Sequence, residues 1–273
     1  MLFAMKTSTS HIAAALAILL GAAHGCALAQ SGPDYSDPIS TDRPDFVDSS
    51  AVVGKGRVQI ETAGAFERSR RDGVTERSVT TPTLLRFGLN DTVELRVETD
   101  GATHSWSRGL DVQDASGMAD SALGLKWHVR DSADGAPALA VRVNAVVPSG
   151  ARRLHNGGVE MSLRGVAEWD LPHELSLGVM PGLASARNDN GERFTSGIFG
   201  VVLGRDWNPR VHSYVELAAP RIAHARDGGS RVAAGFGSTY LLSPNAQVDA
   251  GILGGLNHFT PHLSLTAGLS VKL

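Results

Sequence analysis

Residues 263–273 read LSLTAGLSVKL, and apolar and polar side chains alternate through the whole stretch. Leucine, alanine and valine occupy every odd position, whereas serine, threonine, glycine and lysine occupy the even ones. Because successive side chains of a β-strand point to opposite faces, this two-residue period predicts a strand with one apolar and one polar face. A tilted strand of about ten such residues is long enough to cross a lipid bilayer.

The same period recurs upstream, for example in residues 92–99, 139–147 and 159–169. No apolar run after residue 29 is long enough for a membrane-spanning helix. Most predicted strands have ten or more residues, and their even number is typical of a bacterial outer-membrane barrel. We therefore predict an all-β fold: a transmembrane, antiparallel, up-and-down β-barrel of about 12 strands. The predicted strands are 57–67, 77–88, 92–100, 118–130, 137–147, 157–170, 173–184, 194–206, 209–219, 230–242, 245–254 and 260–273.

The predicted connections alternate between short turns, such as Leu171-Pro172, and longer polar loops, such as 68–76 and 101–117. Outer-membrane barrels have short periplasmic turns and long external loops, so this alternation also predicts the orientation. Large aromatic side chains lie beside the short turns and predict an aromatic girdle at that boundary of the membrane. These residues are Phe87, Trp127, Trp169, Trp207 and Tyr240.

The first 29 residues have the three parts of a secretory signal peptide. Lys6 precedes an apolar run at 12–20, and Ala27-Leu28-Ala29 forms a small-x-small cleavage site. We predict a signal peptide (1–29), an N-terminal periplasmic segment or plug (30–56) and an outer-membrane β-barrel (57–273). Cys26, the only cysteine, would leave with the signal peptide. A lipid-modified Cys26 and a retained anchor helix are the alternatives.

Charged side chains on the polar strand faces should point away from lipid, because Arg or Lys at the bilayer midplane costs about 2–4 kcal/mol. We expect these polar side chains to line the barrel interior, where they either border a water-filled path or pair into a polar core. In an open pore they would set ion selectivity, and in a packed core their loss would destabilise the barrel. The residues are Glu61, Arg86, Glu94, Arg96, Glu98, Lys126, His128, Arg142, Asn144, Glu160, Arg164, Glu168, His212, Tyr214 and Glu216.

The sequence carries no Gly-x-Ser-x-Gly or His-Glu-x-x-His motif. His258 and His262 are four residues apart, but Pro261 excludes the helix that would align them as metal ligands. We therefore expect no enzyme activity, no catalytic residue, no cofactor and no metal site. The chain has 25 Lys and Arg against 28 Asp and Glu, without the basic excess of a nucleic-acid-binding protein.

A motif opens the predicted mature chain: Thr41-Asp42-Arg43-Pro44-Asp45-Phe46, followed by Gly54-Lys55-Gly56-Arg57-Val58-Gln59-Ile60-Glu61. It resembles the start of the outer-membrane transporter family labelled "MetA-pathway of phenol degradation". Thr81-Pro82, the hairpin at 86–96 and Val147-Pro148-Ser149-Gly150 extend the resemblance. It implies a barrel, an outer-membrane location and passage of small molecules; phenol is not carried over as the substrate.

The motif also has a physical interpretation. Pro44 favours an extended Arg43, so Asp42, Arg43 and Asp45 precede the first strand on the periplasmic side. They either fold into the lumen as a polar plug, pair with the turns, or form an inert strap that anchors the terminus. The chain ends in Leu273, where many outer-membrane barrels have an aromatic residue used in assembly, so we expect a weakened insertion signal.

The functional hypothesis is a passive outer-membrane channel or transporter for small molecules, with hydrophobic or aromatic compounds among the candidates. Its expected partners are outer-membrane lipid, a small-molecule solute and the barrel-assembly machinery, with the oligomeric state left open. The alternatives are a structural or adhesive barrel with a closed lumen, an outer-membrane lipid hydrolase, and a soluble β-sandwich.

Overall fold

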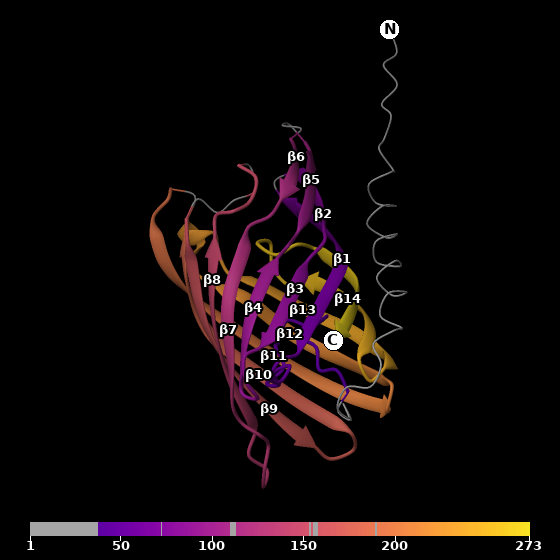
Figure 1. Ribbon diagram of the computed structural model, residues 1–273. Coiled ribbons are helices and arrows are strands. Elements are labelled where there is room, and N and C mark those ends of the chain that lie inside the picture. Colours follow the sequence, from indigo (N-terminus) through magenta and orange to yellow (C-terminus); the bar gives the residue numbers. More distant parts are fainter. Residues whose placement is uncertain (1–37, 72, 110–112, 153, 155–157, 189) are drawn as a thin grey trace. The chain divides into compact units, whose positions relative to one another are not determined.

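The computed structural model describes residues 38–71, 73–109, 113–152, 154, 158–188 and 190–273 (Figure 1). The predicted signal peptide, its cleavage site and Cys26 lie outside these residues. Within the described part of the chain, no helix has both the length and the apolar character needed to cross a membrane.

In the described part of the chain, fifteen β-segments form one antiparallel sheet, which closes on itself because the last segment pairs with the first. Closure satisfies the backbone hydrogen bonds that an open sheet edge would leave exposed to lipid. A one-turn 3₁₀-helix, η2 (Ala225–Asp227), lies in one loop. The segments are β1 (Val58–Arg71), β2 (Val74–Thr80), β3 (Thr83–Gly88), β4 (Val93–Thr99), β5 (Ala102–Arg108), β6 (Asp114–Met118), β7 (Ser121–Arg130), β8 (Ala138–Val147), β9 (Glu160–Leu171), β10 (Leu175–Arg187), β11 (Arg193–Asn208), β12 (Val211–Ile222), β13 (Arg231–Ser243), β14 (Ala246–Gly255) and β15 (Leu263–Lys272).

Three of the barrel strands are interrupted, so the fifteen segments make twelve strands. Both β2 and β3 pair with β1, and they are separated at Pro82, which has no amide hydrogen to donate. The next strand breaks between β4 and β5 at Gly101, whose φ is 66°. A side chain there would meet the carbonyl oxygen of Thr81 at 2.3 Å, so the close approach requires glycine. The predicted twelve-stranded antiparallel barrel is confirmed.

Two loop boundaries were predicted wrongly. The predicted loop 68–76 is a tight hairpin, because β1 continues to Arg71 and β2 begins at Val74. Much of the predicted loop 101–117 belongs to β5 and β6, which pair with each other. Figure 1 shows β2, β5 and β6 extending beyond the other strands at one end of the barrel. Polar side chains on both faces of these extensions leave no apolar alternation for sequence analysis to detect.

The exterior of the barrel is apolar and its interior is polar, the reverse of a soluble protein. In β7, Leu123, Leu125 and Trp127 are exposed, whereas Gly124 and Lys126 between them are buried. The same alternation exposes apolar side chains on β8 to β15. Trp207 and Tyr240 are also exposed beside short turns. An apolar exterior of this kind suits contact with lipid.

This register predicts which substituted positions water can reach. Val143 and Leu163 are 43% and 51% exposed, and Leu95 lies on the same outer face. Cysteines at these positions should be protected from a water-soluble thiol reagent in membranes and react after denaturation. Glu192→Cys, in an exposed loop, is the control that should react in both states. Rapid labelling of intact membranes at Val143→Cys and Leu163→Cys would contradict the assignment of faces.

Candidate functional site: the barrel interior

Residues 38–57, here named the inner segment, lie inside the barrel before β1 begins. The backbone N–H of Ile39 donates to Pro244, in the turn between β13 and β14, at 2.7 Å. The N–H of Gly56 donates to Gly88, at the start of the turn between β3 and β4, at 2.8 Å. Both ends of the inner segment therefore lie at the short-turn end of the barrel, and its middle lies among the buried side chains of the wall.

Four backbone N–H groups hold the inner segment to the barrel wall, and each donates to a glutamate. Hydrogen bonds to a charged acceptor are the stronger kind, and these four reach widely separated strands of the wall. The pairs are Asp42 with Glu61 at 3.0 Å, Phe46 with Glu216 at 2.8 Å, Ser50 with Glu168 at 2.6 Å, and Val53 with Glu94 at 3.0 Å.

Two aspartates of the inner segment pair with cations of the wall. The ammonium of Lys126 donates to both carboxylate oxygens of Asp42 at 2.9 Å, and Arg96 donates to the same carboxylate. Arg86 lies 3.9 Å from it. The guanidinium of Arg142 donates to both oxygens of Asp48, at 2.8 and 2.6 Å. All these groups are buried, so removing one partner would leave an uncompensated charge away from water.

The wall cations also pair with wall glutamates. Arg86 lies 3.0 Å from Glu61 and 2.9 Å from Glu94, and both side chains of each pair are fully buried. Glu98 accepts from Arg96 at 3.0 Å and from Arg142 at 2.6 Å, which links the two ends of the network. Eight of the predicted interior residues thus lie in one network: Glu61, Arg86, Glu94, Arg96, Glu98, Lys126, Arg142 and Asn144.

The other predicted interior residues lie outside this network. Glu168 and Glu216 hold the inner segment elsewhere, and Tyr214 is buried beside Glu216 on β12. His212 pairs with Asp206 at 2.7 Å near the short-turn end. The Nδ1–H of His128 donates to the backbone carbonyl oxygen of Ser50 at 3.0 Å. Arg164 and Glu160 are only half-buried, and the guanidinium of Arg164 lies 5.5 Å from the Phe46 ring.

Several interior residues were not predicted from the sequence. Asp249 lies 3.5 Å from Arg43, which also donates to Thr266 at 2.6 Å. Gln247 donates to Thr41 at 2.8 Å. A signal for both was present, because Gln247 and Asp249 alternate with apolar residues on β14. Asp48 had no such signal, since the inner segment has no regular period.

The three aspartates of the inner segment differ in electrostatic environment. Burial alone would raise the pKa of Asp42, but Arg86, Lys126 and Arg96 together hold it well below its ordinary value. Burial likewise opposes ionisation of Asp48, and Arg142 lowers its pKa. Asp45 forms no salt bridge within the described residues; burial raises its pKa well above the ordinary value, and the neighbouring Glu216 adds to this effect.

Four cavities follow one another through the barrel. The first, of about 860 Å³, lies among the long-loop extensions and shares Leu154 with a second of about 390 Å³. The second shares Arg43 with a third of about 300 Å³. The third shares Ile39 and His212, among others, with a fourth of about 610 Å³ at the short turns. The inner segment lies where the second and third cavities meet.

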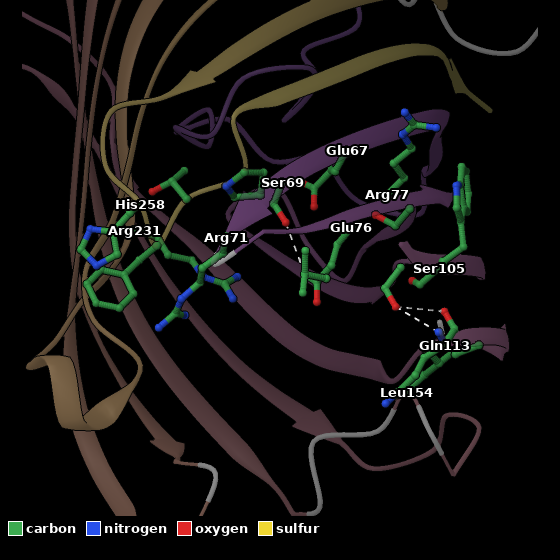
Figure 2. A pocket seen from close by; sticks show the side chains of 18 residues that line it. Glu67, Ser69, Arg71, Glu76, Arg77, Ser105, Gln113, Leu154, Arg231 and His258 are labelled. Carbon is green, nitrogen blue, oxygen red and sulfur yellow. Dashed lines mark hydrogen bonds between the residues drawn. The ribbon is translucent and has the colours of Figure 1, made fainter. Parts of the chain in front are cut away.

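Figure 2 shows the first cavity, with side chains from several strands and loops pointing into it. Arg71, Arg77 and Arg231 line it, together with the carboxylates of Glu67 and Glu76. Arg71 also lies 5.2 Å from the centre of the Phe259 ring. In the part of the chain that the structure describes, no group of three or more His, Cys, Asp or Glu side chains is placed to hold a metal ion.

A closed antiparallel barrel with an apolar exterior and a charged interior is an outer-membrane-type β-barrel. The chain belongs to the family described as "Putative MetA-pathway of phenol degradation", which matches residues 41–273. The match begins at Thr41, the first residue of the motif that enters the barrel. None of the curated proteins matches the chain.

Two solved structures share this fold. The COG4313 outer membrane channel from Pseudomonas putida F1 has a TM-score of 0.62 at 12% identity, covering 86% of this chain and 100% of that one. The NanC porin has a TM-score of 0.50 at 12% identity, covering 78% of this chain and 100% of that one. At these identities the similarity establishes the fold alone.

Proposed function

We propose that the protein is an outer-membrane channel for small molecules. The column of four cavities within a closed barrel carries this proposal, because the cavities reach from the long-loop end to the short-turn end. The channel and porin with the same fold support it. The apolar exterior provides the contact with outer-membrane lipid, and assembly there would use the barrel-assembly machinery.

The lining favours small polar solutes. Charged side chains of Arg96, Arg142 and Glu98 border the second cavity, and Glu168 and His212 border the third. Fixed charges at a constriction set the local potential that a passing solute experiences. Hydrophobic and aromatic compounds, which the sequence hypothesis included, are the comparison solutes in the uptake experiment. The proposal assigns no catalytic residue.

The inner segment acts as a plug in the proposed resting state, and with the predicted orientation it enters from the periplasmic side. Its salt bridges also favour the second candidate, a barrel whose lumen stays closed. Satisfied networks of buried charges are rigid, and a barrel filled by such a network would stay closed. Whether the plug moves is therefore the property that separates the two candidate functions.

Reconstitution separates them directly. The purified protein in a planar bilayer should give discrete conductance steps, with long closed intervals because the plug occupies the lumen at rest. The same protein should increase uptake of small polar solutes in a porin-deficient host. A folded protein that gives neither conductance nor uptake would establish the closed barrel, and release of fatty acid from lipid would support the hydrolase alternative.

A further inference from the structure

We propose that the cationic wall around Asp42 and Asp48 is an anion-binding site, which the inner segment's own carboxylates occupy at rest. Small dicarboxylates that arrive from the long-loop side compete for this site and displace the segment. The inference rests on the proposed channel function and adds to it a class of solute and a mechanism of opening.

The strand register places several cations next to one another on one wall of the barrel. In the strand register, Lys126 on β7 lies directly opposite Arg142 on β8, and Arg142 lies directly opposite Arg164 on β9. Like charges that face each other on neighbouring strands destabilise a sheet. Within the network the wall has four cations, Arg86, Arg96, Lys126 and Arg142, against three glutamates, Glu61, Glu94 and Glu98. The cations of the network outnumber its glutamates, and Asp42 and Asp48 of the inner segment supply the ion pairs of Lys126 and Arg142.

The two charges occupy one compact site. The Asp42 carboxylate lies among Arg86, Arg96 and Lys126, and Asp48 lies against Arg142. The N–H of Ser49, directly after Asp48, donates to Asp42 at 2.8 Å, so the two aspartates are close together. A molecule with two carboxylates a few bonds apart matches this arrangement, whereas a single chloride neutralises only one position.

The site borders a cavity on the long-loop side of the inner segment. Asp42, Asp48, Arg96 and Arg142 all line the second cavity, which shares Leu154 with the large first cavity. The three arginines of the first cavity, visible in Figure 2, exceed its two glutamates. A mouth with net positive charge raises the local concentration of anions. A dicarboxylate can therefore reach the salt bridges that hold the plug before it meets the plug backbone.

The inner segment is held unequally by the two sides of the barrel. On the cationic wall, Asp42 and Asp48 are both ion-paired. On the other side of the barrel, Arg43 of the segment pairs with Asp249 at 3.5 Å, and the N–H of Phe46 donates to Glu216. Loss of the pairs at Asp42 and Asp48 would remove the two salt bridges that hold the segment to the cationic wall, and the segment would keep its contacts at Arg43 and Phe46. Because Arg43 borders both the second and the third cavity, movement of the segment would join them.

Single-channel recording with succinate as the probe tests the inference. At equal ionic strength, replacing chloride by succinate on the long-loop side should raise the fraction of open time about tenfold, in a saturable manner; a tenfold change corresponds to ~1.4 kcal/mol. Acetate, with one carboxylate, should have a much smaller effect. Applied to the short-turn side at the same concentration, succinate should act weakly, because the plug separates it from the second cavity.

A covalent tether provides the matched control. A Cβ atom built at Gly178 lies 3.2 Å from a methyl carbon of Val47, which brings the two positions within reach of a disulfide, and 2.8 Å from a methyl carbon of Val202, which must shift to admit it. The double variant Val47→Cys with Gly178→Cys should form a disulfide that holds the inner segment to β10 and abolishes the succinate response. A reductant should restore the response, and each single variant should respond as the untethered protein does.

Two results would overturn the inference while leaving the channel function intact: equal open time in succinate and chloride, or an undiminished succinate response in the oxidised double variant. Failure of the channel function looks different. In that case the folded, untethered protein conducts in no salt and supports no uptake.

Discussion

Replacing Asp42 by asparagine is expected to destabilise the barrel by about 3–5 kcal/mol, the usual cost of removing one partner from a buried ion pair. The variant leaves Arg86, Arg96 and Lys126 facing a neutral amide. Asp45→Asn, three residues later, should instead stabilise the protein, because Asp45 forms no salt bridge in the described structure and burial disfavours its charge. The temperature at which gel mobility changes from folded to unfolded reports both effects. Destabilisation by both substitutions would contradict the environments assigned to them.

The two aspartates also differ in pH dependence. The raised pKa of Asp45 means that the folded protein binds its proton more tightly than the unfolded chain, so this group's contribution to stability should rise as the pH falls through the raised pKa toward the ordinary value of 3.8. The lowered pKa of Asp42 has the opposite sign: its contribution is complete above the ordinary value of 3.8 and is lost only below it. Asp45→Asn should therefore weaken the rise in stability on acidification above pH 3.8, whereas Asp42→Asn should leave it in place.

Two arginines of the cationic wall form the second comparison. Arg86→Gln should cost about 3–5 kcal/mol, because it leaves Glu61, Glu94 and Asp42 without this cation. Arg164→Gln should cost about 1 kcal/mol or less. Among the described residues Arg164 makes no salt bridge, its Nε has no hydrogen-bond partner, and its principal contact is the Phe46 ring. Thermal unfolding in detergent measures both; equal losses would show that pairing does not determine these costs.

Sequence analysis predicted the strands of the barrel wall more fully than the contacts of the inner segment. Alternation assigns Leu125 to the outer face and Lys126 to the inner face from a few neighbouring residues. This works because the two-residue period of a strand depends only on residues close in sequence. The extensions β5 and β6 escaped detection because water can reach both of their faces. The contacts of the inner segment were also beyond a local pattern, since Asp42 meets Lys126 across 84 positions of sequence. The motif at 41–46 indicated a polar plug as one of three options, without identifying the cations that it meets.

The path of the inner segment has a topological consequence. Because Ile39 and Gly56 both lie at the short-turn end, the inner segment forms a loop that enters and leaves the barrel through the same opening. No chain end has to be threaded through the barrel when it withdraws. The seam between β1 and β15 stays intact, and none of the hydrogen bonds between strands has to break. Barrels with the inner segment inside and outside the lumen therefore differ by a loop movement alone. The strand pairing of the wall is the same in both states.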